Sequence, residues 1–491
     1  MNEIQNPFEQ KTGSARLANP IAILGFAIMS ILFGFLLSQS QINIVFALIA
    51  LPFLLIFLNK VYINPSIGMT FAYILNLVLM GITRYIPIKL GYFMDILLTI
   101  IFLAYFFQHF YKKIDWTILK DDLIYLTVIW FGYIVMEIAN PEAVSIGAWF
   151  SAMRGEALYM LLIIPLVYFI YDKPKNLNTF LYIWAIISLL ASVKGAMQLI
   201  IGPDPWEQKW LDEGGAVTHM LWGKLRVFSF FTDAGQFGAS QAQIGVVGAL
   251  LALNSTNFKL KIFWVIVSLS GFYGMAVAGT RGAMAVPAAG FFLYLFLKKN
   301  VRVISIGMIF MILAFVFFKF TKIGDSNYQI NRMRSSFDTE DASLNTRLRN
   351  QMAFGAYLKS RPIGGGVGHA GNRAQKFVPY GYLANIATDS WYVMIWAECG
   401  IIGLYLHLFI LFYIVGKGSY IIMFRIKDKE LFGKLSALHC GTFGILGASY
   451  GNMVLGQFPT HLIVFTSMAY VFLGVKLDKQ IEELKEKSNS Y

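Results

Sequence analysis

Long apolar runs, separated by short polar connections, make up most of this 491-residue chain. The runs are continuous rather than alternating, which favours helices over the strands of a membrane barrel. A helix needs about 20 apolar residues to cross a hydrocarbon core of roughly 30 Å, and by that length we predict an all-α, polytopic transmembrane helical bundle of about 12–14 helices. The candidate spans are residues 20–38, 42–58, 67–82, 91–109, 122–138, 157–171, 178–201, 234–253, 260–279, 283–297, 303–320, 391–416, 435–455 and 460–475.

One long polar interval, residues 321–390, interrupts this pattern. It separates central helices from C-terminal ones, and the tail after the last span has the charge pairing of a solvated helix. The predicted organisation is N-terminal helices 1–201, central helices 202–320 with an outer loop 202–233, the large loop 321–390, C-terminal helices 391–475 and a tail 476–491.

Composition and charge agree with a membrane protein. Hydrophobic residues are 57% of the chain and charged residues 14%, whereas a soluble globular domain has about 45–50% and about 25%. Lysine and arginine concentrate in alternate connections, which predicts that both termini are cytoplasmic and that residues 321–390 lie outside. The net charge of +13 reflects this bias and attraction to anionic lipid, and it does not argue for nucleic acid.

The outer loop 202–233 leads into the first candidate site residues. Arg226 is followed by an aromatic run and then by Asp233 and Gln236. Its guanidinium could bind a phosphate through two parallel hydrogen bonds. The alternative is an interfacial arginine that anchors a helix.

A second arginine, Arg281, lies between two predicted spans among small residues, Gly279, Thr280 and Gly282. Small neighbours allow close backbone approach, and an arginine on the outer side runs against the orientation bias. Either this residue has a functional partner, or it is part of a tight turn with a snorkelling side chain.

The large loop contains the third group of candidates. Apolar residues recur at helical spacing from Leu344, so Arg347 lies on an amphipathic helix that ends at Arg361 and Pro362. The glycine run 364–368 that follows could expose backbone N–H groups to an anion. Glycine runs are also common in plain linkers.

Two carboxylates follow the loop. Asp389, at its boundary with the next span, is the candidate for proton chemistry, whereas Glu398 lies deeper and is expected to pair with an arginine or to cap a backbone break. The histidines show no ligand spacing, so we expect no metal site. They include His219, His369, His407 and His461.

Taken in order, these residues resemble the signatures of the O-antigen ligase and O-antigen or exopolysaccharide polymerase superfamily. The resemblance covers roughly residues 220–415. The matching positions are Arg226 with Phe228 to Phe237, Thr280 to Ala283, Asn345 to Arg347, Pro362 with Gly366 to Gly368, and Asp389 to Gly403.

The resemblance implies a GT-C-like membrane glycosyltransferase of the bacterial inner membrane, with its active site facing the periplasm. Such an enzyme takes a glycan from an undecaprenyl pyrophosphate carrier and transfers it, with inversion and without a metal or other cofactor, to a sugar hydroxyl. Its expected partners are this donor, a carbohydrate or lipid-linked acceptor, and membrane lipid.

The resemblance also implies roles for individual residues. The catalytic residues would be Arg226, Arg281 and Asp389. The substrate-binding residues would be Arg347, Arg361, Gly366, Gly368, Asp233, Gln236, Tyr392 and Glu398.

Departures from the family pattern bear on which reaction is catalysed. Ligases usually carry His-Asn where this chain has Asp389-Ser390, and a tryptophan where it has Gln351. These differences favour a polymerase that lengthens surface polysaccharide, with a ligase acting on lipid A core as the alternative. A transporter or flippase of lipid-linked oligosaccharide is a further alternative, but the long one-sided loop and the lack of repeated halves favour transfer.

Overall fold

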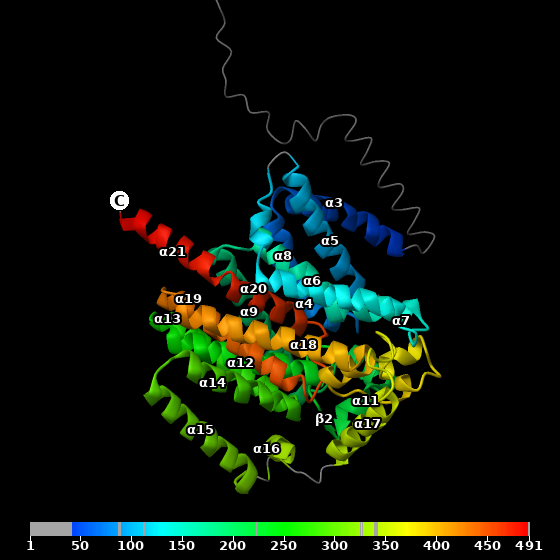
Figure 1. The fold of residues 1–491 in the computed structure, drawn as a ribbon. Coiled ribbons are helices and arrows are strands. Elements are labelled where there is room, and N and C mark those ends of the chain that lie inside the picture. Colours follow the sequence, from blue (N-terminus) through cyan, green and yellow to red (C-terminus); the bar gives the residue numbers. More distant parts are fainter. Residues whose placement is uncertain are drawn as a thin grey trace, which may run out of the picture. The chain divides into compact units, whose positions relative to one another are not determined.

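The computed structural model describes residues 42–86, 90–110, 113–221, 223–324, 326, 328–337 and 342–489, which are almost entirely helical (Figure 1). The chain divides into two compact units, residues 1–65 and 66–491. The described part of the first unit is an apolar helix, α3 (Ile42–Ile63), which contains Pro52. The strands of the second unit's described residues are β1 (Met220–Leu221) and β2 (Lys224–Leu225), which form one antiparallel hairpin. The predicted all-α fold is confirmed.

The remaining elements follow the predicted apolar runs, with short helical turns between them. The longer helices are α4 (Pro65–Ile82), α5 (Gly91–Gln108), α6 (Asp122–Met136), α7 (Ile146–Met153), α8 (Tyr159–Ile170), α9 (Pro174–Ile200), α12 (Ala234–Asn254), α13 (Phe258–Val277), α14 (Ala285–Leu297), α15 (Val301–Phe320), α17 (Ala342–Leu358), α18 (Trp391–Phe424), α19 (Lys429–Ala448), α20 (Thr460–Phe472) and α21 (Gly474–Asn489). The shorter elements are η1 (Trp116–Leu119), η2 (Glu137–Ala139), η3 (Arg154–Leu158), α10 (Pro205–Trp210), η4 (Leu211–Gly215), α11 (Ala216–His219), η5 (Arg281–Met284), α16 (Tyr328–Arg334), η6 (Ser335–Phe337), η7 (Asn372–Lys376) and η8 (Leu383–Asn385).

Within the described residues, nine helices are long and apolar enough to cross a membrane, or ten if α20 and α21 form one bent span. This is fewer than the predicted total of about 12–14. The predicted span 20–38 lies outside the described residues, and the run 283–297 belongs to a shorter apolar helix, Arg281–Leu297. The predicted span 435–455 is wrong at its end, because α19 stops at Ala448 and a loop follows.

Helix α12 is the most deeply buried of these spans. It packs against α9, α13, α14 and α19, and α12, α13 and α14 lie side by side in Figure 1. Glycines allow this close approach: a Cβ added to Gly271 of α13 would lie 2.7 Å from both Gln241 O and Gly245 N of α12. Small residues at helix contacts are typical of membrane bundles, where van der Waals packing drives association.

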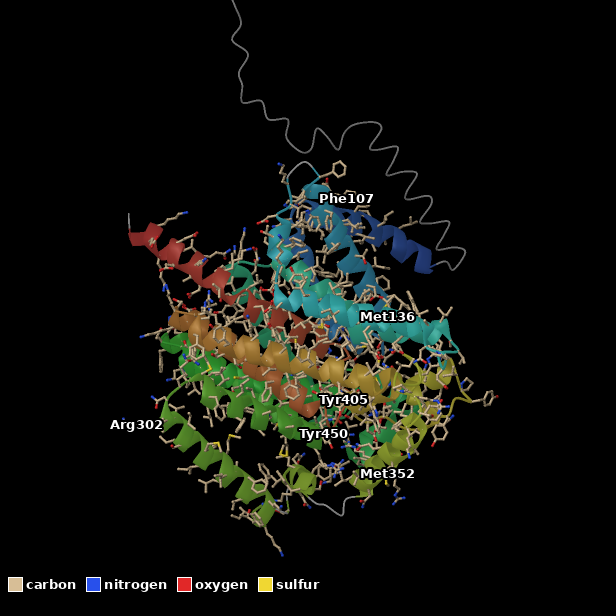
Figure 2. The ribbon with its side chains drawn as sticks, in the orientation of Figure 1. Phe107, Met136, Arg302, Met352, Tyr405 and Tyr450 are labelled. Atoms are coloured by element: carbon tan, nitrogen blue, oxygen red, sulfur yellow. The ribbon has the colours of Figure 1, made fainter. Side chains whose placement is uncertain are left out.

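Large apolar side chains cover the outside of the bundle. Phe107, Met136 and Tyr405, which point outward in Figure 2, are 56%, 72% and 68% exposed. Helix α15, at one edge of the bundle, has no buried residue. Exposed apolar surface on this scale is expected of a protein solvated by lipid.

Helix α18 is broken at Gly400, which has φ +66° and ψ −169°. The loop that follows α17 inserts at the break: Gly365 N donates to Ala397 O and Gly366 N to Glu398 O, both at 2.9 Å. In return, Ile402 N donates to Pro362 O at 3.3 Å. A break in a spanning helix is tolerated because protein groups satisfy the freed backbone.

Candidate active site

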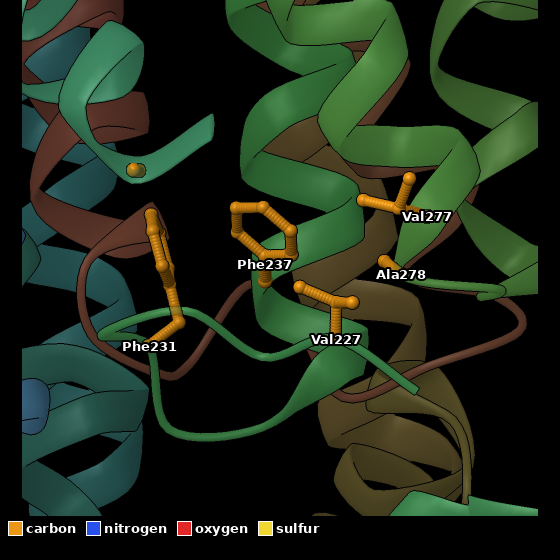
Figure 3. Close-up of a cluster of buried hydrophobic side chains, with 6 residues drawn as sticks. Val227, Phe231, Phe237, Val277 and Ala278 are labelled. Atoms are coloured by element: carbon orange, nitrogen blue, oxygen red, sulfur yellow. The ribbon is translucent and has the colours of Figure 1, made fainter. Parts of the chain in front are cut away.

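Arg226 follows the β1–β2 hairpin and is held by backbone and side-chain oxygens. Its Nη1 donates to Thr218 O at 3.0 Å and its Nη2 to Thr280 Oγ1 at 2.9 Å. The next residue, Val227, belongs to a buried cluster that packs this segment against α9, the start of α12 and the end of α13. Figure 3 shows the cluster, which contains Ala191, Val227, Phe231, Phe237, Val277 and Ala278.

Thr280 joins Arg226 to the short helix η5, which begins at Arg281. The Thr280 hydroxyl donates to Ala234 O at 2.8 Å and therefore also ties η5 to the first turn of α12. Arg281 Nη1 lies 3.4 Å from both the carbonyl and the hydroxyl oxygen of Ser335. Arg281 is thus placed beside the segment that carries Arg226.

Two further arginines come from residues 321–390. Arg332 of α16 donates through Nε to Gly279 O at 3.3 Å, directly before η5. Arg347 of α17 lies close to Gly451, where an added Cβ would be 3.9 Å from Arg347 Nη1 and 3.8 Å from Gly282 Cα. We call Arg226, Arg281, Arg332 and Arg347 the arginine cluster, since Arg281 begins η5 and the other three lie beside η5 or the two residues before it.

The electrostatics of the arginine cluster are unusual for a structural site. Burial lowers the pKa of Arg226 below its ordinary value, and the positive charges of Arg332 and Arg281 lower it further. Among the described residues, neither Arg226 nor Arg347 forms an ion pair with a carboxylate. The charge of Asp233 acts in the opposite direction on this pKa. Arg226 and Arg347, held near other positive groups without such an ion pair, can bind an anion.

Two buried donors beside these arginines have no acceptor among the described residues. They are Arg226 Nε and Asn452 Nδ2. The Asn452 amide lies against Gly282, where an added Cβ would overlap it. Leaving a buried donor unsatisfied is costly, so both groups point to an acceptor supplied by a bound molecule.

Asp233 and Gln236 lie at the start of α12. Asp233 is the N-cap, and its carboxylate accepts from Gln236 N at 3.0 Å. The buried Gln236 amide donates to Val454 O at 3.0 Å and accepts from Thr460 Oγ1 at 2.8 Å. Both residues hold α12 and the loop 449–459 in place, and the structure shows the Gln236 side chain bound to protein rather than facing a cavity.

Asp389 is exposed and lines a cavity of about 320 Å³ next to the arginine cluster. Its backbone has φ +41°, in the left-handed region that a non-glycine residue seldom adopts. The cavity lining, which we call the Asp389 cavity, consists of Gly371, Asn372, Arg373, Ala387, Thr388, Asp389, Asn452, Met453 and Gln457. Asn452 therefore connects the Asp389 cavity with the arginine cluster.

Glu398 has no exposed side-chain surface and accepts from Arg373 Nη2 at 2.8 and 2.7 Å. The same Nη2 is paired with the equally buried Glu156. The expectation that Glu398 pairs with an arginine is confirmed, and its backbone carbonyl accepts from Gly366 N at the α18 break. The structure does not support a substrate-binding role for Glu398, because its carboxylate has no exposed surface and is bound to Arg373.

Arg361 does not join the arginine cluster. Its Nε donates to Glu142 Oε1 at 2.9 Å, and its guanidinium stacks on Tyr357 with 4.1 Å between Cζ and the ring centre. The hydrogen bond from Arg361 lowers the pKa of Glu142. Arg361 follows the C-terminal end of α17, whereas Arg347 lies near the N-terminal end, so the helix itself separates them.

The predicted anion site on the glycine run is wrong. Residues 364–368 are buried, and the N–H groups of Gly364, Gly365 and Gly366 donate to protein carbonyls. A Cβ at Gly366 would lie 2.8 Å from Ala143 Cβ, and one at Gly368 would overlap Ala148 O. The positive φ values of +91° and +80° at these two glycines serve the packing of a loop into the α18 break.

Tyr392, in the first turn of α18, donates from its hydroxyl to Leu446 O at 2.8 Å. This bond joins α18 to α19 beside the loop 449–459. The structure therefore gives Tyr392 a packing contact and shows no approach of its hydroxyl to the Asp389 cavity, whose lining does not include it.

Residues 265–408 match a family model described as O-antigen ligase. The predicted resemblance to the O-antigen ligase and polymerase superfamily is confirmed. The matched segment contains Arg281, Arg332, Arg347, Arg373 and Asp389. The match supports a membrane function of the O-antigen ligase or polymerase type. No curated protein sequence matches the chain.

Three residues of the candidate site were not predicted from the sequence. Arg332 lies in a short helix without a clear apolar period, Arg373 follows the glycine run, and Asn452 lies inside a stretch that was assigned to a span. The sequence feature that could have revealed Asn452 is the polar segment Ser449 to Asn452. A continuous membrane helix would not be expected to contain such a segment. Among the described residues, no group of three His, Cys, Asp or Glu side chains could hold a metal ion.

Proposed function

We propose that this protein is an inverting membrane glycosyltransferase that takes a glycan from an undecaprenyl pyrophosphate carrier and transfers it to a sugar hydroxyl. The reaction occurs at the periplasmic face of the bacterial inner membrane and lengthens a surface polysaccharide. One observation carries the proposal: four arginines from separate segments gather at η5 and the turn before it, where Arg226 Nε and Asn452 Nδ2 are buried with no acceptor among the described residues.

A diphosphate fits this arrangement better than a single carboxylate does. Its two phosphate groups offer several anionic oxygens, and guanidinium groups match such oxygens bidentately. The cluster also lies at the ends of apolar helices, so a polyprenyl chain attached to the diphosphate can remain in lipid.

The chemistry follows from the two neighbouring sites. An acceptor hydroxyl in the Asp389 cavity attacks the anomeric carbon of the donor, and the bond between that carbon and the diphosphate oxygen breaks. The hydroxyl proton passes to the Asp389 carboxylate, as general base catalysis requires. Negative charge that grows on the leaving diphosphate is stabilised by the arginine cluster, whose positions are set before the reaction. Displacement from the opposite face inverts the anomeric carbon.

The matched family description supports ligation to lipid A core as a second candidate. The two reactions share the donor and differ only in the acceptor. Asp389-Ser390, in place of the His-Asn pair usual for ligases, supports the polymerase.

The test uses purified protein in lipid nanodiscs with an undecaprenyl pyrophosphate-linked repeat as donor. The polymerase predicts release of undecaprenyl pyrophosphate and a longer carrier-linked glycan, whereas the ligase produces a glycan-bearing lipid A core when that acceptor is supplied. Arg281→Ala should abolish carrier release. The matched control is Arg302→Ala, since Arg302 is exposed at the far end of α15 (Figure 2). A donor that crosses the membrane without losing its glycan would overturn the proposal in favour of transport.

A further inference from the structure

A group of three charged residues, one arginine and two buried carboxylates, lies at the wall of the Asp389 cavity. Arg373 Nη2 is bound by both oxygens of Glu398 and by Glu156, and neither carboxylate has exposed side-chain surface. Glu156 comes from η3, Arg373 from η7 and Glu398 from α18, so three distant parts of the chain meet here. We call Glu156, Arg373 and Glu398 the Arg373 triad.

Burial of these charged groups costs free energy that an equally stable apolar packing would not cost. Burial of two carboxylates next to one guanidinium leaves a charge imbalance, and well-packed apolar residues would serve stability as well. Burial by itself would lower the pKa of Arg373, but the carboxylates of Glu398 and Glu156 outweigh it and raise this pKa. The triad therefore fixes one guanidinium in one charged state and one orientation.

These contacts with the carboxylates use one nitrogen of a guanidinium whose residue lines the Asp389 cavity. Within the described residues, every carboxylate bond of Arg373 is made by Nη2, and 35% of the side chain is exposed. Arg373 lines the Asp389 cavity together with Asn372, Thr388, Asp389 and Asn452. These residues offer several hydrogen-bonding groups in one small space, which is typical of a sugar-binding subsite.

The charge of the triad indicates what kind of group it binds. The triad contains one guanidinium and two carboxyl groups. Its net charge is negative when both carboxyls are ionised and zero when one of them is protonated. The remaining charged residue in the cavity lining is Asp389, which is acidic. An anion would be repelled here, whereas uncharged hydroxyl and ring oxygens can accept hydrogen bonds from Arg373.

We propose that Arg373 binds the acceptor sugar, through hydroxyl or ring oxygens at its Nη1 and Nε, and that the Asp389 cavity selects an uncharged acceptor sugar. This inference rests on the proposed glycan transfer and assigns the second substrate of that reaction to a defined place. The arginine cluster binds the anionic donor, and the Arg373 triad orients the neutral acceptor toward the Asp389 carboxylate.

The experiment separates acceptor use from donor use. In nanodiscs, Arg373→Gln should raise the KM for an uncharged acceptor glycan roughly 10- to 100-fold, the effect of losing hydrogen bonds to a charged group. Binding of the undecaprenyl pyrophosphate donor, measured by titration in the absence of acceptor, should stay unchanged. Arg281→Ala should show the opposite pattern, with donor binding lost. An acceptor KM equal to that of the unaltered protein would overturn the inference, while failure of the unaltered protein to bind donor would instead overturn the proposed function.

A second variant guards against misfolding. Arg373→Gln alone leaves two carboxylates buried without a cation, which could destabilise the fold. We therefore measure a triple variant as well, which leaves no charge in the triad: Arg373→Gln/Glu156→Gln/Glu398→Gln. The triple variant should fold and show the same raised acceptor KM. The matched control is Lys376→Gln, at an exposed residue of the same η7 that does not line the Asp389 cavity, and it should leave the acceptor KM within about twofold. An acceptor whose terminal sugar carries a carboxylate should be used less well than its uncharged counterpart, and equal use would overturn the proposed selectivity.

Discussion

The Arg226 guanidinium and the Thr280 hydroxyl are joined by a 2.9 Å hydrogen bond, although 54 residues separate them in the chain. The same hydroxyl donates to Ala234 O at 2.8 Å, so it accepts from the arginine with its oxygen and uses its only proton on α12. Thr280 thus fixes the direction of Arg226 relative to Arg281, the next residue in the chain.

Thr280→Val tests this positioning role. Valine keeps the branched shape but removes the hydroxyl, so Arg226 loses one acceptor and Ala234 O loses one donor. We expect the rate of glycan transfer to fall roughly tenfold, because a hydrogen bond to a charged group contributes about 1.5–3 kcal/mol. The control is Thr179→Val in α9, a half-buried threonine whose hydroxyl donates to Lys175 O within its own helix. Equal rates for the two variants would show that Thr280 does not position Arg226.

Gly282→Ala tests the place of Asn452. A Cβ at Gly282 would overlap the Asn452 amide, which would have to turn away from the arginine cluster. Because only the end of a side chain moves, we expect little change in thermal stability but a loss of transfer of roughly 10- to 100-fold. The matched control is Gly416→Ala, where an added Cβ has open space within 4 Å. Transfer at the unaltered rate in Gly282→Ala would remove Asn452 from the site.

Helix positions could be predicted from the sequence because a membrane span requires one continuous apolar run. The run 91–109, for example, became α5 with nearly the same ends. The α18 break could not be predicted in the same way. Gly400 is one of many glycines in apolar runs, and its role depends on the loop at Pro362, which a distant segment supplies.

Three arginines of the candidate site could be predicted from the sequence, because their local sequence pattern is unusual for a membrane protein. Arg226, Arg281 and Arg347 each run against the expected charge of an outer segment or lie on an amphipathic helix. The role of Arg361 could not be predicted, because its partner Glu142 is 219 residues away in the chain. Arg373 has one partner 25 residues away, Glu398, but its second partner, Glu156, is 217 residues away. Sequence spacing contains no information on such contacts.

His219 makes the stability of the site depend on pH. Its buried ring accepts a hydrogen bond from Ala234 N through Nε2 at 3.1 Å, which requires the neutral imidazole. Burial lowers the pKa of His219, whereas in the unfolded chain the value is about 6.5. Below about pH 6.5 the unfolded chain therefore binds a proton that the folded protein does not, so the contribution of His219 is complete above this pH and falls as the pH decreases.

We therefore expect the Tm in detergent to decrease between pH 7.5 and pH 5.5, and to decrease less in His219→Gln. The glutamine carbonyl can accept from Ala234 N but does not titrate. Thermal unfolding of both proteins across this pH range is the measurement. The same pH dependence in both would show that other groups are responsible.

Gly400→Ala should destabilise the protein. The left-handed backbone at Gly400 strains a residue with a Cβ by about 1–3 kcal/mol, and the new methyl group would also overlap Pro362 O. We expect a lower Tm and loss of the loop insertion at the α18 break, measured by thermal unfolding and by protease sensitivity near Pro362. Gly132→Ala in α6, with open space around the added Cβ, is the control. A Tm equal to that of Gly132→Ala would contradict the insertion.

Asp389→Asn tests the general base. Asparagine tolerates the left-handed backbone at this position almost as well as aspartate does, so the cavity should keep its shape while the carboxylate is lost. We expect kcat to fall by roughly 10²- to 10⁴-fold, the usual range for removal of a general base, and donor binding to remain. The control is Asp212→Asn, an exposed carboxylate in the loop 202–233. Since the proposed diphosphate site does not include Asp389, a variant that lost donor binding and turnover together would show that Asp389 has a structural role instead.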